Sequence, residues 1–73
     1  MINAANRHPS TQAISQYFGY DHLPTHLRDI SKACHDLAVE MLVEIPDSPE
    51  LVAGLRKLLE AKDCFVRAAI PAP

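Results

Sequence analysis

The run IPDSPE at residues 45–50 constrains the fold more than any other feature, because it divides two long stretches of helical pattern. Pro46 cannot continue a helix, whereas Ser48 is a good N-cap and Pro49 suits the first position of a new helix. A connection this short makes the two helices neighbours that run in opposite directions. The sequence therefore predicts an all-α fold built on an antiparallel two-helix hairpin.

On each side of this turn, apolar residues recur three and four positions apart, which is the pattern of one buried helix face. We expect the first helix at about 24–45 and the second at about 49–70. The predicted buried positions are Leu27, Ile30, Cys34, Leu37, Ala38, Met41, Leu42 and Ile45 in the first helix, and Leu51, Leu55, Leu58, Leu59, Phe65 and Ala69 in the second. Gly54 inside the second helix costs about 1 kcal/mol relative to alanine, which is easier to understand if two helices approach closely there.

The chain before the hairpin has two parts. Residues 1–9 are polar and predict a flexible N-terminus. Residues 10–18 predict a short helix with Ser10 or Thr11 as its N-cap, and Gly19 ends it. The helical domain thus spans residues 10–70, and the proline-containing residues 71–73 form a C-terminal tail.

Composition indicates that the hairpin assembles with copies of itself. Hydrophobic residues make up 48% of the 73 residues, and two helices offer only one mutual seam in which to bury them. Some apolar surface must therefore face another chain, and we expect a homo-oligomer.

Charge and hydropathy argue against two classes of partner. Seven basic and nine acidic side chains are mixed along the helices and give a net charge of −2, so no basic field exists to hold duplex nucleic acid or an anionic membrane. No run approaches the roughly 20 apolar residues of a membrane span, and the first residues lack the apolar region of a leader. We expect a cytoplasmic protein with no membrane partner.

The sequence offers little catalytic chemistry. Cys34 and His35 are neighbours that would point roughly 100° apart on a helix, so they form no nucleophile and base pair. His22 and His26 share the i,i+4 spacing that can bind a metal, but no third ligand has a matching offset. No glycine-rich phosphate loop occurs. Cys34 and Cys64 are expected to be buried free thiols, and the alternative is a bridge between the two helices, which the hairpin does not need. We expect no enzyme activity, no cofactor and no metal site.

The segment YFGYDHLP at residues 17–24 is a feature that a plain hairpin does not need. Its three aromatic rings and its histidine precede a helix whose first turns carry two cations. Such a group suits a nucleotide, because the base stacks on a ring while Arg or Lys binds the phosphate. The alternative is that the rings pack over the hairpin as core or as a subunit interface. The candidate ligand-binding residues here are Tyr17, Phe18, Tyr20, His22, Arg28 and Lys32.

The chain also contains an FxY segment at residues 18–20, a PDS turn at 46–48 and an LxKLxEA motif at 55–61. In these motifs it resembles the small helical-hairpin sponge proteins of bacteriophages, over about residues 17–70. The resemblance implies a protein that inhibits host immunity by sequestering cyclic nucleotide messengers of CBASS systems, or cyclic ADP-ribose signals of Thoeris systems, without cleaving them. It further implies a symmetric homo-oligomer, commonly a hexamer, in the cytoplasm of the host cell, with ligand pockets between protomers.

By the same resemblance, Phe18 and Tyr20 match the aromatic segment that stacks on bases. Lys32 and His35 lie about where the family has a basic residue on its first long helix, and Arg67 lies in the late part of the second helix, which can reach a phosphate. The leading hypothesis is therefore a cyclic nucleotide sponge. The alternative is a small helical oligomeric interaction module with no small-molecule ligand.

Overall fold

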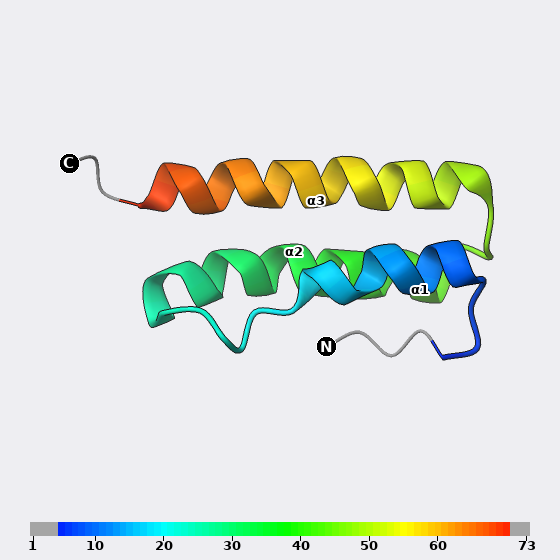
Figure 1. Ribbon diagram of the computed structural model, residues 1–73, viewed down its shortest axis with the longest axis horizontal. Helices are drawn as coiled ribbons and strands as arrows, with labels where there is room; N and C mark the ends of the chain where they lie inside the picture. The colour runs from blue at the N-terminus through cyan, green and yellow to red at the C-terminus, as the bar shows by residue number, and fades with distance from the viewer. Residues whose placement is uncertain (1–4, 71–73) are drawn as a thin grey trace.

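The computed structural model describes residues 5–70, which contain helices and no strand, so the all-α fold class is confirmed for this part of the chain. Helix α1 (Pro9–Ser15) continues into a short 3-10 helix, η1 (Gln16–Phe18). The long helices α2 (Thr25–Glu44) and α3 (Pro49–Ala69) follow. Figure 1 shows α2 and α3 running antiparallel, with α1 lying along one face of the pair. Residues 1–4 and 71–73, which belong to the predicted flexible N-terminus and tail, lie outside the described residues.

The turn between α2 and α3 is built by local hydrogen bonds and prolines. Ile45 leaves the helix with an extended backbone, while its N–H still donates to the Met41 carbonyl oxygen at 2.9 Å. The Ser48 hydroxyl oxygen accepts a hydrogen bond from the Leu51 N–H at 3.0 Å, and Pro49 is the first residue of α3. Because Ser48 satisfies one of the free N–H groups at the start of α3, the second helix begins directly after the turn.

Helix α1 begins earlier than the sequence indicated. His8 is its N-cap, since His8 Nδ1 accepts a hydrogen bond from the Ser10 N–H at 3.1 Å, and Pro9 is the first helical residue. Ser10 and Thr11, the predicted caps, lie inside the helix. Arg7 and His8, within the segment predicted to be flexible, are hydrogen-bonded to the α2–α3 turn.

The hydrophobic core lies where α1, η1, α2 and α3 meet. It consists of Ile14, Phe18, Ala38, Leu42, Leu51 and Leu55. Phe18 is the largest of these side chains and is completely buried. Ser15 and Ser31 are also buried, and within residues 5–70 their hydroxyl oxygens have no hydrogen-bond partner.

Four residues that were predicted to be buried are exposed: Leu37, Ile45, Cys64 and Phe65. The exposed fraction is 44% for Leu37, 38% for Ile45 and 56% for Phe65. Successive residues of an α-helix turn by roughly 100°, so Phe65 and Val52 lie on opposite flanks of the buried Leu55. Because α1 borders α3 on the Val52 side, it leaves the Phe65 side uncovered.

The same geometry applies to α2. His35 lies on the flank that contacts the segment after η1, and Leu37 lies on the opposite flank. The Leu37 flank of α2 and the Phe65 flank of α3 together form the open apolar face of the hairpin. We define this face by exposed Leu37 and Phe65 and by partly buried Ile30, Met41 and Leu58. The exposed Gly54 lies on this flank of α3. Apart from its chain neighbours and the nearby backbone of its own helix, no described atom lies within 4 Å of the place where a Cβ of this residue would be.

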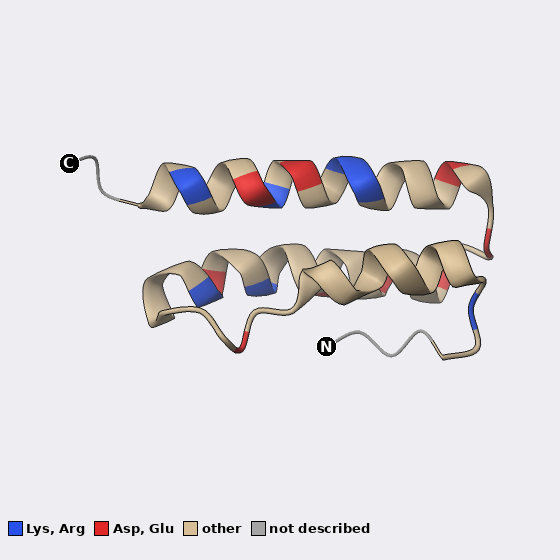
Figure 2. Ribbon diagram, viewed as in Figure 1, with Lys and Arg blue, Asp and Glu red and all other residues tan. Residues whose placement is uncertain are grey.

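The two long helices differ in the order of their charged residues. Figure 2 shows basic and acidic residues alternating along α3. On α2 both basic residues, Arg28 and Lys32, lie in the first half, and Asp36, Glu40 and Glu44 lie in the second. Among the described residues, no helix combines the length and hydropathy that crossing a membrane requires.

Candidate functional site

The loop between η1 and α2 is fixed by hydrogen bonds within the loop and to the first turn of α2. The Arg28 guanidinium donates from Nε and Nη2 to the Leu23 carbonyl oxygen, at 3.2 and 3.1 Å. The Leu23 N–H donates to the Tyr20 carbonyl oxygen at 3.1 Å. The loop that carries Tyr20 is therefore held against the first turn of α2.

Tyr20 lies over the second and third turns of α2. Its ring meets the His35 ring edge to face, with centroids 4.9 Å apart and planes at 68°. His35 Nδ1 lies 3.0 Å from Asp36 Oδ1, and Lys32 Nζ donates to Asp36 Oδ2 at 2.7 Å. We call Tyr20, Lys32, His35 and Asp36 the Tyr20 cluster, because these contacts join all four side chains.

The charges in the Tyr20 cluster stabilise one another. The hydrogen bond from Lys32, and after it the contact with His35, lowers the pKa of the Asp36 carboxyl. The hydrogen bond to Asp36 raises the pKa of the Lys32 ammonium, and the nearby Tyr20 adds to this effect. Lys32 is half exposed, and its ammonium offers three donors of which Asp36 uses one. The cluster thus combines an aromatic face, an imidazole and a cation that can still bind an anion.

The structure brings together only some of the predicted ligand-binding residues. Tyr20, Lys32 and His35 form one group, and Arg28 holds the adjoining loop. Phe18 belongs to the core and is completely buried, so its ring offers no face to a ligand in this chain. The outcome for Phe18 matches the alternative in which a ring of this segment packs as core.

Three other predicted ligand-binding residues do not belong to the Tyr20 cluster. Tyr17 is 59% exposed and borders α3 instead of α2. His22 is exposed in the loop, and within residues 5–70 it forms no hydrogen bond or ion pair. Arg67 lies near the end of α3, where its Nη2 lies 3.4 Å from Cys64 Sγ.

The two thiols are in different surroundings. Cys34 and Cys64 are free; Cys34 is buried and Cys64 is exposed. Burial raises the pKa of the Cys34 thiol, while the positive charge of Lys62 acts in the opposite direction. Cys34 is therefore held in its protonated form at neutral pH, in which it is a poor nucleophile.

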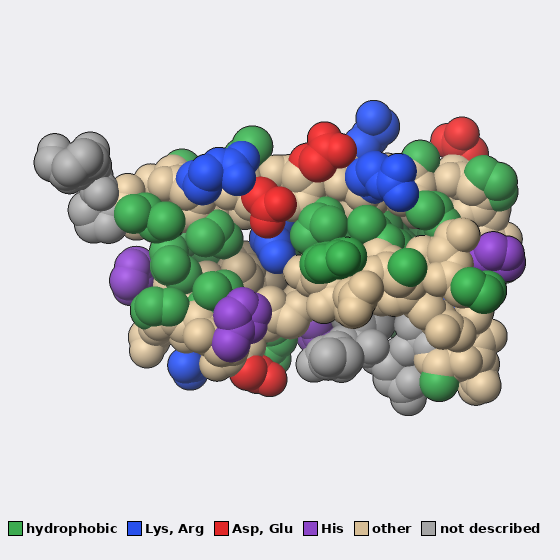
Figure 3. All heavy atoms as spheres, viewed as in Figure 1, with side chains coloured by type: hydrophobic (Ala, Val, Ile, Leu, Met, Phe, Trp, Pro, Cys, Tyr) green, Lys and Arg blue, Asp and Glu red, His purple; other side chains and the backbone are tan. Residues whose placement is uncertain are grey.

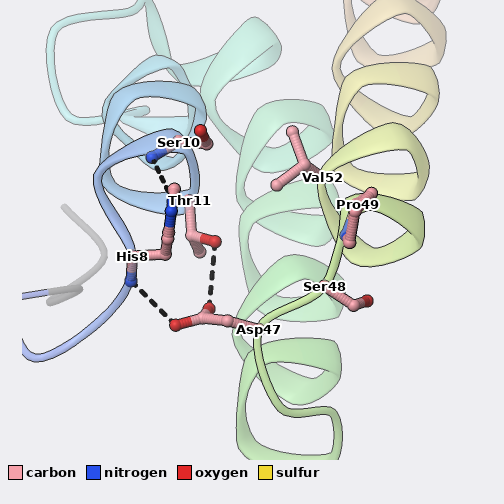
Figure 4. A pocket seen from close by; sticks show the side chains of 7 residues that line it. All are labelled: His8, Ser10, Thr11, Asp47, Ser48, Pro49 and Val52. Carbon is pink, nitrogen blue, oxygen red and sulfur yellow. Dashed lines mark hydrogen bonds between the residues drawn. The ribbon is translucent and has the colours of Figure 1, made fainter.

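A separate cleft of about 430 Å³ lies at the opposite end of the hairpin, between the start of α1 and the α2–α3 turn. Figure 4 shows the side chains that line it: His8, Ser10, Thr11, Asp47, Ser48, Pro49 and Val52. None of the predicted ligand-binding residues is among them. We call it the turn cleft.

Asp47 is the charged residue of the turn cleft, and hydrogen bonds from the N-terminal segment surround its carboxylate. Arg7 Nε donates to Oδ1 at 2.8 Å, the His8 N–H donates to Oδ2 at 2.7 Å, and Thr11 Oγ1 donates to Oδ1 at 3.0 Å. These bonds, the His8 N–H first, lower the pKa of Asp47. Arg7 also donates to the carbonyl oxygens of Leu42 and Ile45 at 2.7 and 2.8 Å.

These contacts connect α1 to the hairpin, and we call the connection formed by Arg7, Thr11 and Asp47 the joint. The guanidinium of Arg7 binds the carbonyl oxygens of Leu42, in the last turn of α2, and of its C-cap Ile45, where a cation is also favoured by the helix dipole. The carboxylate of Asp47 already accepts hydrogen bonds from three donors of the same chain, so little of its capacity to accept hydrogen bonds remains for a ligand. The joint attaches α1 to the hairpin at its closed end.

Sequence reasoning missed two groups of residues. The joint of Arg7, Thr11 and Asp47 was missed because Asp47 is an ordinary turn residue and its partners lie about 40 positions earlier. Lys62 was also missed, although a signal existed: it lies seven residues after buried Leu55, on the same helix face, where a lysine is unusual. Its side chain is only 12% exposed.

No cluster of three or more His, Cys, Asp or Glu side chains among residues 5–70 could hold a metal ion. Comparisons with known proteins found no matching family model, no similar curated protein and no similar solved structure. The geometry of the site and the sequence motifs are therefore the basis for a functional proposal.

Proposed function

We propose that this protein is a non-enzymatic sponge: a homo-oligomer that binds a cyclic nucleotide immune messenger and withholds it from its receptor. The observation that carries the proposal is the Tyr20 cluster, in which an ordered aromatic ring and an imidazole adjoin a half-exposed ammonium. The motif resemblance to phage sponge proteins supports a role in anti-defence. It suggests messengers of CBASS or Thoeris systems as ligands.

The Tyr20 cluster has the chemistry that a cyclic nucleotide requires. A base can stack on the part of the Tyr20 ring that His35 leaves free, and Lys32 can donate to a phosphate oxygen. Because Arg28 already fixes the loop, binding would order few additional groups, and this reduces its entropic cost.

A single chain cannot enclose such a ligand, and this supports an oligomer. Binding sites for small molecules commonly bury about 70–90% of the ligand surface. Tyr20 is only half-buried and Lys32 is exposed, so the opposite wall of a pocket must come from another protomer. The open apolar face, with Leu37 and Phe65 exposed, provides a surface through which protomers can associate. It lies on the flank of α2 opposite His35, so a protomer other than the one bound there must complete the pocket.

The first test is a thermal-shift screen of the purified protein with cyclic di-AMP, cyclic tri-AMP and cyclic ADP-ribose isomers. A ligand at 100 times its Kd adds about 2.7 kcal/mol per site, which raises Tm by on the order of 10–20 °C for a domain of this size. Ligand recovered from the complex should have an unchanged mass. Recovery of a cleaved product would contradict the non-enzymatic part of the proposal.

The second test uses point variants in calorimetry. Tyr20→Ala should weaken binding about 5- to 150-fold and Lys32→Ala about tenfold or more, with the oligomer mass unchanged. Lys57→Ala is the matched control, since Lys57 is an exposed lysine on α3 that makes no hydrogen bond or ion pair within the described residues. If the wild type binds none of the screened nucleotides at tens of micromolar, the sponge proposal is wrong.

A second candidate function is a helical interaction module with no small ligand. The open apolar face favours it, because exposed Leu37 and Phe65 suit a helix of another protein as well as a second copy. Leu37→Asp should leave the chain folded, since Leu37 is half exposed, but should abolish association through this face. The module replaces the sponge if association occurs and no nucleotide binds.

A further inference from the structure

A shallow groove of about 320 Å³ runs between α1 and α3, on the face that carries α1. Gln16 and Tyr17 of η1 line one side of it, next to α1, and Val52 and Arg56 of α3 line the other side. Figure 3 shows hydrophobic side chains gathered along the seam between these helices, with basic and acidic side chains alternating along the α3 rim. We call it the α1–α3 groove; its basic residue, Arg56, was not assigned by the sequence motifs.

Tyr17 presents an exposed ring on a fixed backbone. Tyr17 is 59% exposed, yet it belongs to η1 and its carbonyl oxygen accepts a hydrogen bond from Lys62 Nζ at 2.8 Å. The Lys62 side chain is 12% exposed, and its ammonium also lies 3.6 Å from Asp63 Oδ1. A partner that stacks on Tyr17 would therefore immobilise little of the chain, which favours binding.

Arg56 supplies an uncommitted cation beside this ring. Its side chain is exposed, and within residues 5–70 it makes no hydrogen bond or ion pair. A guanidinium carries five N–H donors in a planar fork that matches two oxygens of a phosphate. Glu60 and Asp63 are the nearby acidic residues on α3. The ammonium of Lys62 is already in contact with Asp63 and with the Tyr17 carbonyl oxygen, so Arg56 is a more available cation than Lys62.

The two tyrosines of the aromatic segment lie against different helices. Tyr20 contacts His35 of α2, whereas Tyr17 borders Val52 and Arg56 of α3. A ligand on the Tyr20 cluster therefore leaves the ring of Tyr17 free. An exposed ring of this kind, beside a free guanidinium, has the same pairing of aromatic and cationic groups as the Tyr20 cluster.

We propose that the α1–α3 groove is a second nucleotide contact, in which Tyr17 stacks on a base and Arg56 binds the adjoining phosphate. Lys62 is a positioning residue that holds the backbone of Tyr17. The inference rests on the proposed nucleotide-binding function and extends it from Tyr17, a candidate from the sequence, to Arg56 and Lys62 of α3, which the sequence did not identify.

Calorimetry on the full-length chain tests this contact with cyclic di-AMP, cyclic tri-AMP and cyclic ADP-ribose as probes. Tyr17→Ala should weaken the binding of at least one probe by about 5- to 150-fold, which is the range for removing one stacking ring. Arg56→Gln should weaken the same probe at least about tenfold. Lys57→Gln is the matched control, because it removes a charge from the neighbouring position and should change affinity by less than about twofold.

The role of Lys62 is separated from general stability by a double-mutant cycle. Lys62→Met should weaken binding in the wild-type background but have little further effect in the Tyr17→Ala background, because it acts through the position of that ring. Circular dichroism and the oligomer mass of each variant establish that it is folded and assembled. If the losses of affinity from Lys62→Met and Tyr17→Ala are additive in the double variant, Lys62 does not act by positioning Tyr17.

The outcomes distinguish this inference from the function on which it rests. If the wild type binds no probe, both proposals are wrong. If the wild type binds and Tyr20→Ala weakens binding, while Tyr17→Ala and Arg56→Gln do not, the sponge stands and the second contact is wrong. If the groove variants lower the oligomer mass at unchanged affinity per protomer, the groove is a subunit contact and the inference is likewise overturned.

Discussion

Substitution of Phe18 separates the two roles that an aromatic residue in this segment can have. Phe18 is completely buried and packs with Ile14, Ala38, Leu42, Leu51 and Leu55. Truncation of a buried phenylalanine to alanine costs about 3–5 kcal/mol, from lost burial and from the cavity that remains. A 73-residue chain has a total free energy of unfolding of about 4–11 kcal/mol, at 0.05–0.15 kcal/mol per residue. Phe18→Ala should therefore remove a large part of the stability of the protein.

Urea denaturation followed by circular dichroism measures this loss. With an m-value of about 1 kcal/mol per molar urea for so small a protein, the midpoint should fall by about 3 M or more. Wild type and variant must be compared at equal protein concentration, because association adds to apparent stability.

Phe18→Leu is the matched control for the ligand role. It keeps an apolar side chain in the core at a cost of less than about 1.5 kcal/mol if the neighbours repack, so the protein should remain folded. Nucleotide affinity should then equal that of the wild type. The reasoning is refuted if Phe18→Ala keeps its urea midpoint, or if Phe18→Leu is fully stable but loses nucleotide binding.

Three further predictions follow from the contacts of the fold. The folded-state pKa of Asp47 is lowered, so its contribution to stability is present above the unfolded pKa of about 3.9 and is lost as the pH falls through the lower folded value; Asp47→Asn should be less stable at pH 7 and show a flatter acid dependence in urea titrations, whereas parallel curves would contradict this. Gly54→Ala should raise helix propensity by about 1 kcal/mol but weaken the oligomer, because no contact of the described chain explains the glycine; a higher Tm at unchanged oligomer mass would count against a helix packing there. Asp36→Asn should free Lys32 and tighten nucleotide binding up to about fivefold in calorimetry, and weaker binding would show that the carboxylate itself takes part.

Local chemistry accounts for the parts of the fold that could be predicted from the sequence. Pro46, Ser48 and Pro49 act within a few residues of themselves, so the turn and the antiparallel hairpin follow from steric limits and from one capping hydrogen bond. The predicted helices at about 24–45 and 49–70 differ by one residue at most from the ends of α2 and α3. The start of α1 was less predictable, because a histidine cap is chemically possible but uncommon.

The candidate site was predictable in part for the same reason. Lys32 and His35 are three positions apart and so lie near one another on any helix. The contact of Tyr20 with His35 was not determined locally, because it requires the loop to fold back along α2. Arg56 and Lys62 could not be assigned, because their place beside Tyr17 depends on how η1 packs against α3.

By itself, the sequence determined that the chain forms helices, where the hairpin turns and which residues are apolar. Only the tertiary structure decided which apolar flank is covered. The apolar stripes of α2 and α3 are wider than the seam between them, so α1 can cover just one side. Helix α1 covers the Val52 side of α3 and is held there by Arg7 and Asp47 from distant parts of the chain, while the loop after η1 covers His35 of α2. Phe65 on the other side stays exposed because no element of the described chain remains to cover it.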